Sequence, residues 1–185
     1  MNFSKTLTKI HDAFLIHPKA FGDSRGFFLE SWSKEAFKEL GLDFDFVQDN
    51  HSRSSKGVLR GLHYQSGDTA QGKLVRVSSG IVYDVFVDLR KSSPSFGIWD
   101  GVFLTEEQHE MLWVPPGCAH GFLVVSDVAD FQYKVTAPYN SKTEKSLLWN
   151  DPTLNISWPL EGIENPLVSS KDAQALHFED CEKYT

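Results

Sequence analysis

Short runs of apolar residues, separated by glycine- or proline-bearing turns, fill most of the second half of the chain. Two strand-like runs, Lys73–Val77 and Ile81–Leu89, follow each other closely and are rich in aliphatic and aromatic residues. Further runs of this kind are Phe96–Leu104, Met111–Val114, Gly121–Val125 and Phe131–Thr136. Short β-branched and aromatic segments at this spacing predict an all-β sandwich or barrel.

The first fifty residues have a less regular pattern. Ile10–Pro18 alternates loosely and predicts a first strand, and the stretch Asp23–Gly26 predicts a tight turn between two strands. Phe21 and Phe28 flank this turn, and on pattern alone we expect both side chains in the core. Ser33–Leu40 predicts a short helix, with Ser33 as N-cap and a glycine at its C-terminal cap.

Polar stretches predict turns and short helices in the remaining segments. Gln48–Ser54 is typical of a turn, or of hydrogen-bonding groups that face a ligand. Ser78–Gly80 predicts a turn between two of the strands. The capping-box pattern that begins at Thr105 precedes no long apolar run, so we expect one helical turn at most there. Ser169–Leu176 predicts a short helix in the tail that follows Trp149.

Composition narrows the class of protein. The 185 residues suit one domain, spanning 1–185, that buries a full core. A net charge of −7 argues against nucleic acid or a membrane as partner, although a locally positive pocket remains compatible with it. Cys118 and Cys181 lack metal-type spacing, which fits a reducing compartment. With no membrane-length apolar run, these features predict a cytoplasmic protein.

The stretch Gly57–Gln65, GVLRGLHYQ, holds the densest candidate chemistry. It places a cation, Arg60, and an imidazole, His63, between strand-like runs and close to Lys73. Either residue alone fits an ordinary strand, whereas the three together favour a site set into a sheet. Side chains three apart in a regular strand point to opposite faces. Arg60 and His63 therefore share a pocket only if Gly61 bends or bulges the strand.

Two motifs predict a cupin-like jelly-roll barrel with a few short peripheral helices. Gly57-x5-His63 matches the start of the first cupin motif, and Pro115-x-Gly117-x-x-His120 matches the second. A metal-binding cupin needs another histidine where Gln65 stands. One histidine from each motif makes a poor site for a first-row metal, so we expect none.

The titratable residues in this region suit acid–base chemistry. The candidates are His63, Lys73, His120, Tyr133, Glu144 and Asp172. A histidine backed by a carboxylate is a base, a tyrosine donates a proton, and a lysine stabilises an oxyanion. Such a set suits proton abstraction beside a ketone and reprotonation from the other face, which is epimerisation. Nucleophile-elbow and phosphate-loop motifs are absent from the sequence, so hydrolase and kinase functions have no support.

From about Phe21 to Asp172 the chain resembles the dTDP-4-dehydrorhamnose 3,5-epimerase family. The matching stretches are FGDSRGFFLE, FVQDNHSRSSKGVLRGLHYQ, GKLVRVSSGIVYDVFVDLR, SFGIW, WVPPGCAHGF, YKVTAPY, WNDP and SSKD. The resemblance implies a jelly-roll homodimer without a cofactor. The implied reaction inverts C3 and C5 of dTDP-4-dehydro-6-deoxy-D-glucose, giving the rhamnose configuration. It is the third step of dTDP-L-rhamnose synthesis, which feeds cell-surface polysaccharide.

The resemblance also implies residue roles. His63 is the base, Asp172 its carboxylate partner, Tyr133 the proton donor, and Lys73 the cation on the C4 oxygen. Arg25 and Arg60 match the pyrophosphate contacts, where guanidinium forks suit bidentate capture. The other matching substrate contacts are Phe21, Phe28, Glu30, Gln48, Asp49, Asn50, His120, Tyr139, Glu144 and Lys171, with Phe21 and Tyr139 facing thymine. On pattern alone, Glu144 and Lys171 are typical of solvated residues.

Alternative functions remain open. The same pocket suits an epimerase that acts at C3 only, or one that acts on another nucleotide-activated 4-keto sugar. A non-catalytic cupin that binds sugar nucleotides is a further alternative, and a metal-dependent cupin enzyme is a more distant one. Asp84 and Asp88 interrupt an apolar strand, and we expect them to form structural hydrogen bonds.

Overall fold

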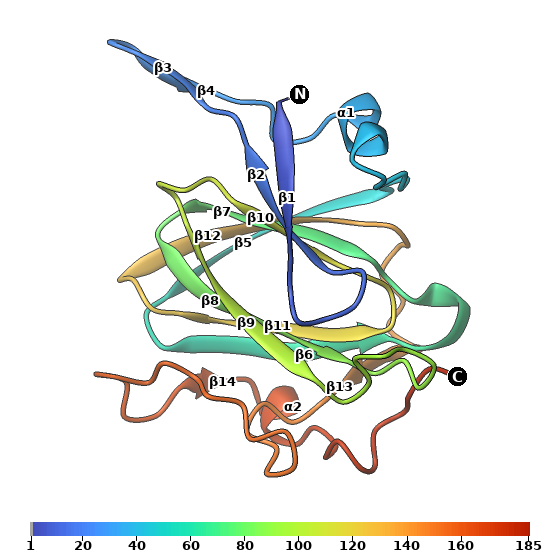
Figure 1. Cartoon of the computed structure of the whole chain (residues 1–185). Helices are drawn as coiled ribbons and strands as arrows, with labels where there is room; N and C mark the ends of the chain where they lie inside the picture. The colour runs from blue at the N-terminus through green and yellow to red at the C-terminus, as the bar shows by residue number, and fades with distance from the viewer. Residues whose placement is uncertain (1) are drawn as a thin grey trace.

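Two facing β-sheets form the body of the protein in the computed structural model, which describes residues 2–185 (Figure 1). The first sheet contains, in spatial order, β1 (Phe3–Leu7), β2 (Phe14–Pro18), β10 (Met111–Val114), β7 (Lys73–Ser79), β12 (Val128–Val135) and β5 (Gln48–Ser55). The second contains β13 (Glu144–Ser146), β6 (Val58–Gln65), β11 (Cys118–Val124), β8 (Ile81–Asp88) and β9 (Trp99–Thr105). The pairs within these two orders are antiparallel, which confirms the predicted jelly-roll barrel.

The main core lies between the two sheets. Strand periodicity explains its composition, because alternate residues of each strand face inward. On β8, Val82 and Phe86 face the core and are fully buried. They pack against side chains of the opposite sheet such as Val75 and Phe131. Each such side chain contributes about 1.5–3 kcal/mol when its apolar surface leaves water.

The outer face of each sheet is covered by a different part of the chain. Helix α1 (Lys34–Glu39) buries Phe37 against the first sheet, beside Trp113 of β10. The segment after Trp149 runs along the second sheet (Figure 1). It buries Leu154 and Cys181 against that sheet, together with short elements β14 (Leu167–Val168) and α2 (Ser170–Ala173). This covering segment carries part of the site described below.

A β-hairpin projects away from the sandwich near the N-terminus (Figure 1). It consists of β3 (Phe21–Asp23) and β4 (Gly26–Phe28), with the predicted tight turn between them. The expectation that its phenylalanines lie in the core is wrong, because the hairpin contacts neither sheet closely enough to bury them. Phe28 is 69% exposed and Phe21 is 47% exposed.

The structure corrects several element boundaries. Strand β1 precedes the predicted first strand, which begins only at Phe14. The segment Gln48–Ser54, predicted as a turn, lies within β5, because its backbone pairs with β12 in continuous register. The helix predicted over Ser169–Leu176 ends at Ala173, since Leu176 forms a parallel bridge with Leu147, the residue that follows β13. Helix α1 is confirmed, and the Ser33 hydroxyl accepts a hydrogen bond from Ala36 N–H.

The remaining expectations concern cysteines and membrane spans. Both thiols, Cys118 and Cys181, are free and buried. Among residues 2–185, no helix is long and apolar enough to cross a membrane.

Candidate active site

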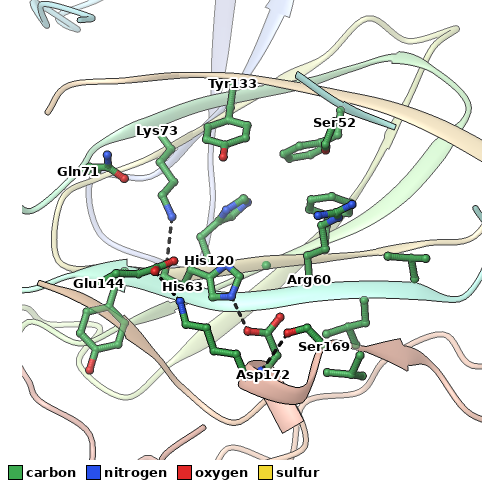
Figure 2. Close-up of a pocket in the computed structure, with 18 of the residues that line it drawn as sticks. Ser52, Arg60, His63, Gln71, Lys73, His120, Tyr133, Glu144, Ser169 and Asp172 are labelled. Atoms are coloured by element: carbon green, nitrogen blue, oxygen red, sulfur yellow. Dashed lines mark hydrogen bonds and ion pairs between the residues drawn. The ribbon is translucent and has the colours of Figure 1, made fainter. Parts of the chain in front are cut away.

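A cavity of about 580 Å³ opens between the two sheets. Figure 2 shows its two facing walls, with Lys73 and Tyr133 on one side and Arg60, His63 and His120 on the other. Its titratable lining comprises Arg60, His63, Tyr64, Lys73, His120, Tyr133, Tyr139, Glu144, Lys171 and Asp172. The structure therefore gathers residues of β6, β7, β11, β12, β13 and α2 that lie far apart in the sequence.

Strand β6 bulges at Gly61, as the sequence requires for Arg60 and His63 to share the cavity. In the pairing with β11, His63 lies opposite His120 but Arg60 lies opposite Phe122, so three steps on β6 match two on β11. Gly61 has φ of 122°, a region that favours glycine. A Cβ there would lie 2.6 Å from Gly121 Cα, so only glycine fits.

His63 and Asp172 form a hydrogen-bonded dyad. Nε2 of His63 lies 2.6 Å from Oδ1 of Asp172, which is 3% exposed. Oδ2 accepts a hydrogen bond from Gly61 N–H at 3.3 Å. Burial alone would raise the pKa of Asp172. The hydrogen bonds from the His63 ring and from Gly61 N–H hold this pKa below its usual value. The ionised carboxylate accepts the Nε2 hydrogen, which leaves Nδ1 as the basic nitrogen.

Helix α2 places Asp172 in this position. The Ser169 hydroxyl caps the helix by accepting a hydrogen bond from Asp172 N–H at 3.1 Å. Asp172 thus lies in the first turn, and its side chain reaches the second sheet beside His63 (Figure 2). Ser169, the first residue of the stretch SSKD, therefore positions the carboxylate of the dyad.

Lys73 supplies a buried cation to the opposite wall. Its ammonium donates a hydrogen bond to the His63 carbonyl at 3.0 Å. Burial lowers the pKa of Lys73 to about 8, while nearby Asp84 opposes the shift. A cation held this way in a poorly solvated cavity stabilises an oxyanion strongly.

Tyr133 lies on β12, on the same wall as Lys73, and its hydroxyl points into the cavity (Figure 2). Its ring packs against the main core beside Phe131, as the alternation along β12 predicts. Burial raises the pKa of Tyr133, so the phenol keeps its proton at neutral pH, and Arg60 partly opposes the shift. The tyrosine therefore faces the His63 wall across the cavity, as a proton donor to the opposite face of a substrate would.

The mouth of the cavity carries three charged side chains, Arg60, Glu144 and Lys171. Arg60 donates a hydrogen bond from Nε to Ser54 Oγ at 3.1 Å, and no carboxylate among residues 2–185 forms an ion pair with it. Its guanidinium is therefore available to an anion. Glu144 forms an ion pair with Lys171 at 2.5 Å and accepts a hydrogen bond from the Tyr139 hydroxyl at 2.9 Å.

Pattern alone predicts that Glu144 and Lys171 are solvated. The Lys171 side chain is 52% exposed, which confirms this, whereas that of Glu144 is 19% exposed, and both line the cavity. Hydrogen bonds from Lys171 and Tyr139 outweigh burial and lower the pKa of Glu144. Residue type alone misses this cluster, because its partners come from β13, from α2 and from the segment between β12 and β13.

His120 and Asp84 form a second buried pair at the floor of the cavity. Nε2 of His120 lies 2.9 Å and 3.0 Å from the two carboxylate oxygens of Asp84. Asp84 thus forms the structural hydrogen bond that the sequence predicts. Asp88 does so as well, with Arg90, Ser93 and Ser95 outside the cavity.

Gln65, which stands where a metal-binding cupin has a histidine, is engaged with the backbone. Its amide nitrogen donates to the carbonyls of Thr69 and Pro138, and its oxygen accepts from Asn140 N–H. Within residues 2–185, no group of three or more histidine, cysteine or carboxylate side chains is arranged to hold a metal ion.

Several predicted substrate contacts lie outside this cavity. Asp49 and Asn50 line a smaller cavity of about 260 Å³, where Asp49 forms an ion pair with Lys134. Gln48 lies near the rim and accepts a hydrogen bond from Tyr139 N–H at 3.1 Å. The pairing of β5 with β12 holds these three residues outside the lining of the main cavity. Their roles as substrate contacts therefore stay predictions.

The four predicted contacts Phe21, Arg25, Phe28 and Glu30 lie on or just beyond the projecting hairpin and do not line the cavity of their own chain. Arg25 forms an ion pair with Asp23 at 2.5 Å, and Glu30 accepts a hydrogen bond from Asn2. Conversely, Ser52, Gln71 and Ser169 line the cavity without having been predicted. Strand alternation on β5 was the available signal for Ser52, once that segment is recognised as a strand.

Known proteins resemble the chain over nearly its whole length. A family model described as dTDP-4-dehydrorhamnose 3,5-epimerase matches residues 7–180. The protein of that name from Escherichia coli (strain K12) is 54% identical over 175 residues, covering 94% of this chain and 93% of that protein. A crystal structure of a dTDP-6-deoxy-D-glucose-3,5-epimerase from Legionella pneumophila, in complex with dTDP-4-keto-L-rhamnose, matches with a TM-score of 0.92 at 49% identity, covering 97% and 95%. A 3'-monoepimerase from Streptomyces bikiniensis, in complex with dTDP-quinovose, matches with a TM-score of 0.84 at 33% identity, covering 91% and 84%.

Proposed function

The chain belongs to the dTDP-4-dehydrorhamnose 3,5-epimerase family, and we propose that it converts dTDP-4-dehydro-6-deoxy-D-glucose into dTDP-4-dehydro-L-rhamnose. The observation that carries the proposal is the arrangement of base and acid across one cavity. The His63–Asp172 dyad lies on one wall, and the Tyr133 hydroxyl and the Lys73 ammonium lie on the other (Figure 2). Inversion at a carbon requires that the proton leaves one face and returns to the other.

In the first step, Nδ1 of His63 takes the proton from C5 or C3 of the sugar. The electron pair of the broken C–H bond forms the enolate double bond to C4, and the carbonyl pair moves onto the C4 oxygen. Lys73 stabilises the negative charge that develops there. The dyad partner Asp172 stabilises the imidazolium that results.

In the second step, the enolate carbon takes a proton from the Tyr133 hydroxyl on the opposite face, and the C4 ketone reforms. The phenolate then regains a proton from water, and His63 releases its proton to water. No net oxidation occurs and no bond is hydrolysed. Because C3 and C5 both flank the C4 ketone, one enolate-stabilising cation serves both carbons.

The diphosphate of the substrate requires cations at the mouth of the cavity. Arg60 is one, because it lines the cavity without a carboxylate partner among residues 2–185. Tyr139, 55% exposed at the same mouth, offers a ring for the thymine base.

The projecting hairpin supplies the predicted contacts Phe21, Arg25 and Phe28 in a two-fold homodimer. The hairpin projects away from the sandwich (Figure 1), and its exposed rings Phe21 and Phe28, together with Arg25, do not line the cavity of their own chain. Aromatic and arginine side chains of this kind are enriched in protein interfaces. In the dimer, each hairpin reaches the cavity of the other protomer, and the isologous interface makes the two contributions equivalent.

The same site supports the single-carbon alternative, and the similarity to a 3'-monoepimerase specifically favours keeping it. In that reaction only the C3 proton is exchanged and inverted. A purely sugar-binding role needs no acid–base set, so the arrangement of His63, Lys73 and Tyr133 argues against it. The two free thiols, Cys118 and Cys181, fit a single domain that works in the reducing cytoplasm.

Product analysis tests the proposed function. The purified protein is incubated with dTDP-4-dehydro-6-deoxy-D-glucose, and an NADPH-dependent reductase that accepts the L-configured 4-keto sugar traps the product. We expect NADPH oxidation and the L-rhamnose configuration by NMR. A product inverted at C3 alone identifies the single-carbon alternative, and unchanged substrate contradicts both.

A further inference from the structure

Asp84 is a fully buried carboxylate to which the proposed reaction gives no role. It lies on β8 with 0% exposure, between the inward-facing core residues Val82 and Phe86. Moving an ionised carboxylate into apolar surroundings is costly unless charged or hydrogen-bonding partners compensate. The identity of those partners therefore indicates what the carboxylate does.

The first partner is His120, whose Nε2 contacts both carboxylate oxygens, at 2.9 Å and 3.0 Å. Strand β11 places His120 beside β8, where it pairs with Phe86. The imidazole also stacks on Phe131, with ring centroids 6.1 Å apart and an interplanar angle of 22°. The ring is thus fixed both by its hydrogen bonds and by its stacking partner.

The Lys73 ammonium affects Asp84 through its charge, without a hydrogen bond or ion pair between the two groups among residues 2–185. Burial lowers the pKa of Lys73, and the Asp84 charge is the largest effect that opposes this lowering, with a smaller one from Glu144. Burial lowers the pKa of His120, so its imidazole is neutral at neutral pH, although the Asp84 carboxylate opposes the shift. Lys73 across the cavity, and His63, which pairs with His120 on the neighbouring strand, add to the lowering.

We propose that Asp84 is a positioning residue, which holds His120 with its Nδ1 lone pair available to the substrate. The same carboxylate charge favours the protonated form of Lys73. Burial raises the pKa of Asp84, while the charge and hydrogen bond of His120 and the charge of Lys73 oppose the shift. In its ionised form the carboxylate only accepts, which puts the hydrogen of the neutral imidazole on Nε2. His120 then accepts a hydrogen bond from a sugar hydroxyl and does not donate one to the C4 oxygen. That leaves Lys73 as the cation on the C4 oxygen. The inference rests on the proposed function, because it assigns these roles within the epimerase reaction.

The charge of Asp84 is tested by the pH dependence of kcat/KM in the Asp84→Asn variant. We expect the alkaline limb, which reports loss of the Lys73 proton, to move down by about one pH unit, which is about tenfold in activity above the new midpoint. The matched control is Asp88→Asn, which removes an equally buried carboxylate of the same strand that lies outside the cavity. Asp88→Asn should lower stability but leave the limb in place.

The tautomer of His120 is measured on the unmodified protein, so the test stands even if Asp84→Asn does not fold. In 15N-histidine-labelled protein, with the His120 signal assigned through His120→Gln, we expect a neutral ring protonated at Nε2. An Nδ1-protonated ring overturns the inference. So does an alkaline limb that stays in place in a folded Asp84→Asn variant, or that moves equally in Asp88→Asn. Wild-type protein without epimerase activity would instead contradict the proposed function, and the tautomer measurement would still decide the position of His120.

Discussion

Asp172 Oδ1 lies 2.6 Å from His63 Nε2, although 109 residues separate the two in the chain. The contact forms because the C-terminal segment runs along the second sheet and places α2 beside β6. It fixes which ring nitrogen is free to act as base.

The Asp172→Asn variant tests that contact. The amide removes the negative charge and allows the wrong tautomer of His63, so we expect kcat to fall by about 10²-fold or more with little change in KM. The matched control is Asp151→Asn, since Asp151 is a buried carboxylate paired with His177 at 3.1 Å outside the cavity. Steady-state kinetics of both variants, with their melting temperatures, decide the outcome. Equal kcat losses in the two variants would show that stability, and not the dyad, is responsible.

The variants His63→Ala and Tyr133→Phe should fail in different ways. Loss of the base should abolish both turnover and exchange of substrate protons with solvent. Loss of the phenolic proton should block inversion while exchange on the His63 face continues, because abstraction and return then use the same face. Mass spectrometry of the substrate recovered from D₂O measures exchange, and the coupled reductase measures inversion. Near-normal inversion by Tyr133→Phe would assign the acid to another group.

Lys73 sets the expected alkaline limit of activity. Its pKa of about 8 predicts that kcat/KM falls as pH rises above that value, because the neutral amine stabilises the enolate oxygen poorly. The same lowering of the Lys73 pKa also makes the stability of the folded protein depend on pH. The folded-state pKa lies below 10.5, the ordinary value for lysine, so between the two values the unfolded chain binds more protons, and the contribution of Lys73 to stability rises with pH over that window. A pH profile that stays flat to pH 10 would contradict the assignment.

Mixing two inactive variants tests the exchange of hairpins between protomers. Arg25→Ala damages the hairpin and His63→Ala damages the cavity. A dimer with one copy of each variant has one intact site, formed by the cavity of one protomer and the hairpin of the other. After subunits exchange at random, we expect activity to recover to about a quarter of the wild-type level. Light scattering should give a dimeric mass throughout. No recovery in mixed dimers of confirmed composition would show that each hairpin serves its own chain.

Sequence patterns predicted the barrel well because strand periodicity and turn residues are local signals. They also predicted that Gly61 must bulge for Arg60 and His63 to share a cavity, which the register of β6 against β11 confirms. The strand Gln48–Ser55 was missed because its residues are polar on both faces and resemble a turn. Its strand character depends on hydrogen bonds to β12, which come from residues some eighty positions later.

The limits of prediction at the site follow from the same physics. The pairing of Asp172 with His63 follows from the fold, and no local pattern specifies it. The exposure of Phe21 and Phe28 contradicted the expectation of a core position, because hydrophobicity alone does not distinguish a core from an interface. The ion pair of Glu144 with Lys171 likewise joins β13 to α2, so residue type indicated only two solvated side chains.

Deuterium incorporation at C3 and C5 tests the central proposal most directly. The protein is incubated in D₂O with dTDP-4-dehydro-6-deoxy-D-glucose and the trapping reductase, and the product is analysed by NMR. One base, His63, and one enolate-stabilising cation, Lys73, serve both carbons that flank the ketone, so we predict deuterium and inversion at both. The two exchanges need not share a rate, because the ring must shift for His63 to reach each carbon. Deuterium at neither carbon, with the nucleotide sugar shown to bind, would contradict an acid–base epimerase at this site.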